Sequence, residues 1–228
     1  MVESFNSSPL NYDEYIMFSG IDLTKVNGIL LDLDDTVYLY EPCHHVSLDA
    51  MLSYFAKAFN IDEQKSKDIY LAARAKTHQN LNGRAASHSR LLYAKYMVEE
   101  VVEAMNPEFV LELENVYWDT FLREMKIDKE ALKFLENCRL NNVKVVIVTD
   151  LTTGIQLKKV IKLGIKNYLT GIITSEEAGT EKPSPEPFNR ALSLLNMSAE
   201  EVIMVGDNEK KDRKGAEALG IKWVHPFN

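Results

Sequence analysis

The chain has 228 residues, of which 46% are hydrophobic and 26% charged, as in an ordinary globular protein of aqueous solution. Its formal net charge of −8 argues against nucleic acid as a partner, because nucleic-acid binding needs clustered lysine and arginine. The sequence has no apolar run long enough for a membrane span, and its two cysteines, Cys43 and Cys138, form no motif. The first residues lack the basic and apolar regions of a secretion signal, so we expect a cytoplasmic protein with free thiols.

The first strong structural signal is the segment G-I-L-L-D-L-D-D-T-V-Y at 28–38, which follows an arm, residues 1–20, that we expect to be irregular. The apolar start of this segment predicts a buried parallel strand, and the strand ends in Asp32, Asp34 and Asp35. Because side chains alternate along a strand, Asp32 and Asp34 should point to the same side. Two such carboxylates repel each other, so they require a divalent cation, a proton or different roles.

Residues 43–125 predict an all-helical insert. The stretch 39–45 looks like a linker, because Pro42 prevents regular continuation of the strand. Capping residues and helically spaced apolar residues predict helices that begin near residues 47, 61, 87 or 89, and 107. We therefore predict one domain from residues 1–42 and 126–228, and a helical domain over residues 43–125.

From residue 129 onward, strand signals alternate with helix signals. Apolar runs at 143–148, 171–174, 202–205 and 221–224 predict strands, and the stretches between them predict helices. This alternation favours a parallel sheet with right-handed crossovers. The predicted fold class is α/β, with a Rossmann-like doubly wound parallel sheet and the helical domain inserted after its first strand.

Polar residues follow several of these strands: Asp32 and Asp34 the first, Thr149 the second and Asp207 a later one, and Lys182 lies in a loop before a helix. In a doubly wound sheet, the carboxyl ends of the strands meet at one edge, where ligands bind. Each signal is weak alone, because a strand-end aspartate is usually a turn residue and a loop lysine is usually solvated. Together, in this order, they predict one site.

In these segments the sequence resembles the haloacid dehalogenase-like hydrolases, which are predominantly Mg²⁺-dependent phosphatases. D-L-D-D-T at 32–36 is similar to the family's D-x-D-x-T motif, and V-I-V-T-D at 146–150 to its second motif. Lys182, which precedes a proline, resembles the third motif, and G-D-N-E-K-K-D at 206–212 resembles the fourth. The resemblance covers residues 27–42 and 128–228, and the helical insert occupies the position of the family's cap.

The resemblance implies a role for each residue. Asp32 would be the nucleophile that forms an aspartyl-phosphate, and Asp34 would be the general acid and then the general base, protonated as substrate arrives. The phosphate would be held by Thr149, Asp150 and Lys182. The Mg²⁺ ion would be held by Asp32, the backbone carbonyl of Asp34, Asp207 and Asp212. Two alternatives stay open: Asp150 as a simple helix cap, and Asp212 as a partner of Lys182 and not of the metal.

The segment N-G-R-A-A-S-H-S-R at 82–90 is the most unusual part of the insert. We expect Arg84, His88 or Arg90 to face the site and to recognise a carboxylate or a second phosphate of the substrate, with a plain surface turn as the alternative.

The leading functional hypothesis is a phosphatase for a small metabolite: a sugar phosphate, an acylneuraminate-type phosphate or a nucleotide. The alternatives are a phosphomutase and a catalytically silent binding protein. A dehalogenase is disfavoured, because that chemistry needs neither a metal nor an acid at the position of Asp34.

Overall fold

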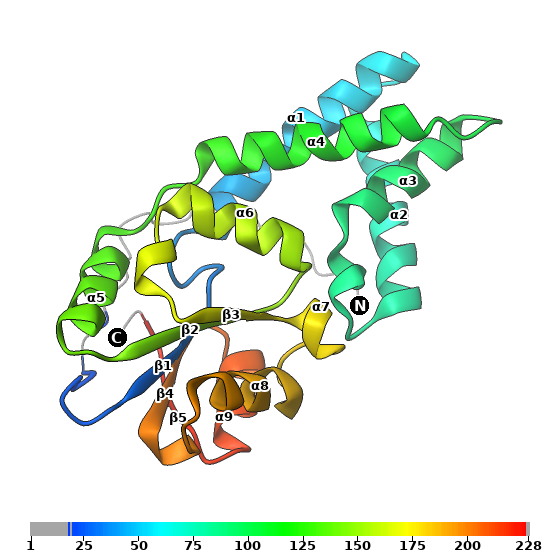
Figure 1. Ribbon diagram of the computed structural model, residues 1–228. Coiled ribbons are helices and arrows are strands. Elements are labelled where there is room, and N and C mark those ends of the chain that lie inside the picture. The colour runs from blue at the N-terminus through cyan, green and yellow to red at the C-terminus, as the bar shows by residue number, and fades with distance from the viewer. Residues whose placement is uncertain (1–17, 19, 227–228) are drawn as a thin grey trace.

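The computed structural model describes residue 18 and residues 20–226, so the predicted arm, residues 1–20, lies almost entirely outside the described residues. Within the described part, five parallel strands form one sheet in the order β3-β2-β1-β4-β5. The strands are β1 (Gly28–Leu31), β2 (Lys144–Thr149), β3 (Gly171–Thr174), β4 (Val202–Val205) and β5 (Lys222–Val224). The chain builds the sheet outward from β1 on both sides, which confirms the predicted doubly wound α/β fold (Figure 1).

Helices cover both faces of the sheet (Figure 1). In β1, Ile29 and Leu31 belong to the apolar cluster that contains α5 and α6, whereas Leu30 belongs to the opposite cluster with α8 and α9. This alternation explains why β1 has no polar residue, since both of its faces are buried. The covering helices are α5 (Lys129–Leu140), α6 (Thr153–Leu163), α8 (Pro185–Leu195) and α9 (Lys214–Glu217), and the one-turn α7 (Ser175–Ala178) follows the end of β3.

Between β1 and α5 the chain forms a group of helices that we call the helical insert. It comprises α1 (Tyr40–Phe59), α2 (Glu63–Leu81), the 3₁₀ turn η1 (Ala85–His88), α3 (Arg90–Val101) and α4 (Pro107–Glu124). Helix α1 lies along α4, and α2 lies along α3, away from the sheet (Figure 1). The helices thus run over residues 40–124, and the division into two domains at residues 43 and 125 stays a prediction.

The beginning of α1 differs from the prediction. The stretch 39–45, predicted as a linker, belongs mostly to the first turns of α1. Pro42 is the third residue of this helix, where the backbone N–H that proline lacks would have no partner within the helix. The carboxylate of Asp35 accepts a hydrogen bond from the backbone N–H of Tyr40 at 2.7 Å, so an acid that follows β1 anchors the beginning of the helix. The helical insert therefore starts directly beside the acidic strand end.

The predicted start signals of the other long insert helices are confirmed. Asp62, Ser89 and Asn106 each accept a hydrogen bond from a backbone N–H three residues later, at 2.7, 3.2 and 3.0 Å. Such caps satisfy N–H groups that have no partner within the helix.

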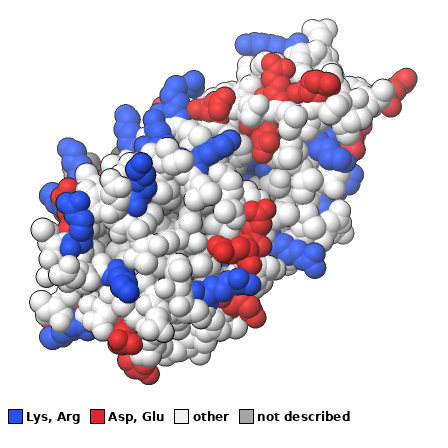
Figure 2. Space-filling view, in the orientation of Figure 1, with Lys and Arg blue, Asp and Glu red and all other residues white. Residues whose placement is uncertain are grey.

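No described helix combines the length and the apolarity needed to cross a membrane. On the face that Figure 2 shows, basic and acidic side chains are interspersed with uncharged surface. Cys43 and Cys138 are buried and free.

Candidate active site

A cavity of about 300 Å³ lies between the carboxyl ends of the strands and the helical insert. Its walls include every residue for which the sequence predicts a catalytic, phosphate-binding or metal-binding role: Asp32, Asp34, Thr149, Asp150, Lys182, Asp207 and Asp212. These residues lie at or after the carboxyl ends of β1, β2 and β4, in the loop before α8, or in the helical turn at 209–213. They are up to 180 positions apart in the sequence. The fold therefore brings the predicted residues together at one edge of the sheet.

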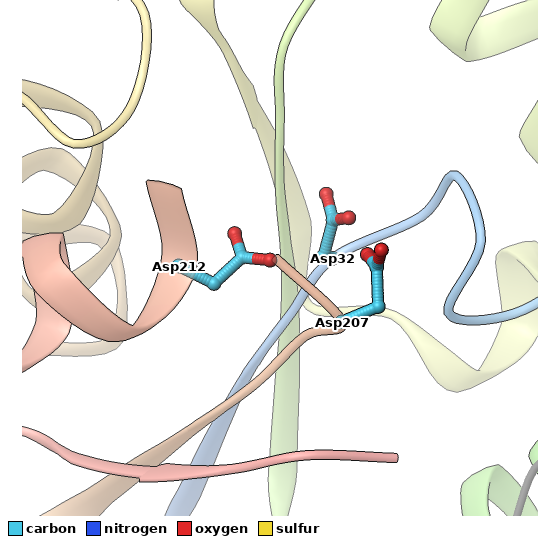
Figure 3. A group of neighbouring side chains, drawn as sticks. All are labelled: Asp32, Asp207 and Asp212. Atoms are coloured by element: carbon cyan, nitrogen blue, oxygen red, sulfur yellow. The ribbon is translucent and has the colours of Figure 1, made fainter. Parts of the chain in front are cut away.

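Three carboxylates form a compact cluster in this cavity. Asp32, Asp207 and Asp212 each offer an oxygen, and these oxygens lie within 4.8 Å of one another (Figure 3). Burial, and then the carboxylates of Asp212 and Asp207, raise the pKa of Asp32 well above its ordinary value, although Lys182 opposes this shift. Three carboxylates against one ammonium group leave an excess of negative charge, so the cluster has the oxygen ligands and the charge that suit a hard divalent cation.

Lys182 connects two of these acids. Its Nζ donates hydrogen bonds to Asp32 at 2.7 Å, to Asp212 at 2.6 Å and to the carbonyl of Val148 at 2.9 Å. Burial opposes the charge of this lysine, but the carboxylates of Asp212 and Asp32 outweigh burial and hold its pKa above the ordinary value. Asp212 thus bonds Lys182 and also lies within reach of a shared metal, so its two predicted roles are compatible in this geometry.

A glycine makes room for Asp212. A Cβ atom on Gly206 would lie 2.3 Å from Asp212 Oδ2, closer than any contact that non-bonded atoms tolerate. The glycine of the G-D pair after β4 is therefore explained by sterics, and the aspartate by the chemistry of the site.

Asp207, the second member of the pair, connects the loop after β4 to the loop after β1. Its backbone N–H donates to the buried Thr36 hydroxyl at 3.3 Å, and that hydroxyl donates to the Asp207 carboxylate at 3.4 Å.

Thr149 is oriented by a residue that the sequence analysis missed. Gln156 Nε2 donates to the Thr149 hydroxyl oxygen and to the Asp150 carbonyl, both at 2.7 Å. The hydroxyl itself donates to the Asp150 carbonyl over 3.4 Å, a long hydrogen bond, so a phosphate oxygen can take the place of that carbonyl as the acceptor.

The Asp150 carboxylate accepts hydrogen bonds from the backbone N–H of Lys182 at 3.1 Å and from Lys211 Nζ at 2.7 Å, so it anchors the Lys182 loop.

Asp34 is held by a buried lysine that the sequence analysis also missed. Lys159 of α6 has a fully buried side chain, and its Nζ donates to both oxygens of Asp34, at 2.7 and 2.8 Å. The Tyr38 hydroxyl donates to the same carboxylate. Burial lowers the pKa of Lys159, and the Asp34 carboxylate opposes that shift. Two donors therefore fix the orientation of the carboxylate predicted to exchange protons with the substrate.

On the insert side of the cavity, the three residues predicted for specificity separate into two groups. His88 and Arg90 line the cavity, whereas Arg84 is exposed and does not belong to its walls. His88 Nε2 lies 3.2 Å from the Glu181 carboxylate, and the backbone N–H of Glu181 donates to the Gly83 carbonyl at 3.1 Å. The loop that carries Lys182 therefore contacts the helical insert directly.

Comparison with protein families gives a match over residues 26–220, to a family described as haloacid dehalogenase-like hydrolase. A ribulose-1,5-bisphosphate 5-phosphatase from Halopiger xanaduensis is 36% identical over 198 residues, which are 86% of this chain and 83% of that protein. A glyceraldehyde 3-phosphate phosphatase from Methanocaldococcus jannaschii is 28% identical over 200 residues, which are 87% and 84% of the two chains.

Solved structures share the same fold. A phosphatase of the haloacid dehalogenase type from Thermococcus onnurineus and a 2-haloacid dehalogenase from Pseudomonas syringae each have a TM-score of 0.69 at 21% identity, over 88% of this chain and 86% of theirs. Because these neighbours differ in their named chemistry, the likeness establishes the fold and leaves the reaction to the residues of the site.

Proposed function

The chain belongs to the haloacid dehalogenase-like hydrolase family and is a phosphoric monoester hydrolase, and from this premise we propose that it cleaves its substrate through an aspartyl-phosphate on Asp32. The resemblance drawn from the four motifs is thus confirmed, as is the prediction of a phosphatase for a small phosphorylated metabolite. The observation that supports the mechanism is the meeting of Asp32 with Lys182 and two further carboxylates in one cavity.

In the proposed reaction, an oxygen of Asp32 attacks phosphorus while the bond from phosphorus to the leaving oxygen breaks. The leaving oxygen takes a proton from the hydrogen-bonded group of Asp34, Lys159 and Tyr38. A water molecule then attacks the aspartyl-phosphate, returns a proton to that group and releases inorganic phosphate, which restores Asp32. Lys182 and the Thr149 hydroxyl stabilise the phosphoryl oxygens throughout, because phosphoryl transfer depends mainly on positioning and charge neutralisation.

Mg²⁺ is the cation that we propose for the three-acid cluster. Asp32, Asp207 and Asp212 supply hard oxygen ligands and an excess of negative charge, which is the donor set that Mg²⁺ prefers. When bound, the ion would neutralise charge on the phosphoryl group. The sequence analysis also assigned the backbone carbonyl of Asp34 to the metal; the carboxylate of Asp34 is occupied by Lys159 and lies outside the cluster.

Among the substrates that the sequence leaves open, we propose a phosphorylated sugar of few carbons. The cavity volume of about 300 Å³ suits a small metabolite. The two relatives described above are named for a phosphorylated pentose derivative and for a phosphorylated triose.

A phosphomutase remains the alternative reaction, with the same nucleophile but a phosphoryl group returned to the substrate. A cytoplasmic location and the absence of a nucleic-acid partner stay predictions.

The test is a phosphate-release screen over phosphorylated sugars, nucleotides and an acylneuraminate phosphate with Mg²⁺. We expect release from at least one sugar phosphate, and a fall to background with EDTA and in Asp32→Asn. Asp119→Asn, a change at an exposed aspartate of α4, serves as the matched control and should keep full activity. Unchanged activity in Asp32→Asn would contradict the mechanism, and formation of an isomeric sugar phosphate without phosphate release would favour the phosphomutase.

A further inference from the structure

The cavity has two chemically different ends. The acids and Lys182 occupy the end at the sheet. The opposite end is formed by α1, η1, α2 and α3 of the helical insert, and its walls include Arg74 and Arg90. Among the described residues, Glu41 is the one acid that the insert adds to the walls, and its carboxylate lies 3.4 Å from His45 Nε2. The insert end is therefore basic, in a chain whose formal net charge is −8.

Arg90 is a buried cation that pairs with no carboxylate among the described residues. It is 6% exposed, and its Nη1 donates to the His88 carbonyl at 2.8 Å. Its Nη2 donates to the hydroxyls of Tyr40 and Tyr117, the latter at 3.2 Å, and its Nε is buried without a partner. Buried arginines are normally neutralised by a carboxylate or a phosphate. The described residues supply no such group here, which leaves the charge of Arg90 available to an external anion.

Aromatic rings hold Arg90 in place without neutralising it. The guanidinium carbon lies 4.9 Å from the ring centre of Tyr117, 5.4 Å from that of Tyr93 and 5.6 Å from that of Trp118. Cation–π contacts of this kind stabilise a cation, but the rings are neutral and the net charge persists. A purely structural role would explain the packing, yet it would not explain why this charge is part of a cavity wall.

Arg74 adds a second cation to the same end. It is an exposed residue of α2, lies one turn after Tyr70, which also lines the cavity, and forms no ion pair with any described residue. His44 also lines the cavity, and its pKa is lowered to about 3 by burial first, and then by the charges of Arg90, His45 and Arg74. Both guanidinium groups therefore act electrostatically on the same region of the cavity.

We propose that Arg74 and Arg90 form a second anion site, which binds a phosphate or carboxylate group of the substrate while the phosphoryl group to be removed lies at Asp32. A guanidinium presents parallel N–H donors that match either kind of oxyanion. The substrate class is then a small metabolite with a phosphoryl group at one end and a second oxyanion at the other. This inference rests on the proposed function, because it assigns the phosphoryl group to the acidic end of the cavity.

The kinetic test compares substrates that differ only in the second anion. Phosphate release is measured with a pentose 1,5-bisphosphate against the pentose 5-phosphate, and with 3-phosphoglycerate against glycerol 3-phosphate; an aryl phosphate serves as the generic substrate. We expect the wild-type protein to prefer one doubly anionic substrate, and the preferred pair identifies the second anion as phosphate or carboxylate. In Arg74→Gln and Arg90→Met, kcat/KM for that substrate should fall about tenfold or more beyond any fall for the aryl phosphate.

Controls separate the proposed site from general effects on the insert. Arg84→Gln removes an exposed arginine of the same insert that lies outside the cavity walls, and it should leave the preference intact. Arg74→Gln changes an exposed side chain, so it keeps the test valid even if Arg90→Met fails to fold. Equal losses on the aryl phosphate and the doubly anionic substrate in Arg74→Gln would overturn the proposal.

A binding measurement provides a readout that does not depend on turnover. In the Asp32→Asn background, calorimetry should show that the preferred doubly anionic substrate binds about tenfold or more tightly than its singly anionic counterpart, and that adding Arg74→Gln removes this advantage. A wild-type enzyme that hydrolyses monoesters through Asp32 without any such preference would refute the second anion site alone. A protein that hydrolyses none of the substrates would refute the proposed function instead.

Discussion

Removing the charge of Asp34 should destabilise the protein more than removing the charge of its partner Lys159. Breaking a buried ion pair by removing one partner costs about 3–5 kcal/mol, because the other charge stays buried. The Lys159 side chain is 0% exposed, so Asp34→Asn leaves an ammonium group without access to water and should cost an amount in that range. The Asp34 side chain is 23% exposed and keeps its hydrogen bond from Tyr38, so Lys159→Met should cost only about 1–3 kcal/mol.

The assay is urea unfolding of the two single variants and the double variant. The double variant should be more stable than the sum of the single effects predicts, with a coupling free energy of at least about 1 kcal/mol. The exposed pair Lys95–Glu99, 2.5 Å apart, is the matched control and should show a coupling of about 0.5 kcal/mol or less. The reasoning fails if Lys159→Met destabilises as much as Asp34→Asn, or if the buried pair couples no more strongly than the exposed one.

Three other changes test the packing and the electrostatics. Gly206→Ala should raise the Mg²⁺ concentration needed for half-maximal activity about tenfold or more, since the new Cβ would lie 2.3 Å from Asp212 Oδ2; an unaltered Mg²⁺ titration would disprove the steric argument. Gly215→Ala would place a Cβ 2.3 Å from the ring of Phe188 and should cost about 1–3 kcal/mol in urea unfolding, and no loss would mean that the ring moves freely. Because burial lowers the pKa of His44 to about 3 in the folded state, the unfolded chain binds this proton more tightly, and stability should fall as the pH drops below about 6.5. His44→Asn should remove about 2 kcal/mol of that loss between pH 6.5 and 5, and equal pH dependence of both proteins would contradict the assignment.

The strands and their acidic ends were predictable because burial on both faces of a parallel sheet leaves an unmistakable apolar run. β1 is such a run, and the change from Leu31 to Asp32 marks where the strand leaves the core. The convergence of Asp32, Lys182 and Asp207 followed from the general geometry of doubly wound sheets. These inferences needed no knowledge of how any individual side chain packs.

The partners of the site residues were not predictable in the same way. Lys159 lies on a helix, where lysine is normally exposed, and only the packing of α6 against the insert reveals that its side chain is buried. Gln156, one turn earlier, has no sequence signal for its bond to Thr149. The start of α1 was misplaced because Pro42 was interpreted as a break, although proline is compatible with the first turn of a helix.

Glu181 and Lys182 are consecutive residues with contacts in opposite directions. Glu181 contacts His88 and Gly83 of the helical insert, and Lys182 contacts Asp32, the proposed nucleophile. The helical insert, to which we assign the selection of the metabolite, and the acid that we propose as nucleophile are therefore linked through a single peptide unit, with about 3.8 Å between the Cα atoms of Glu181 and Lys182. Sequence changes in the turn at 83–88 can thus alter turnover without replacing any acid, because they displace the main chain that carries the lysine.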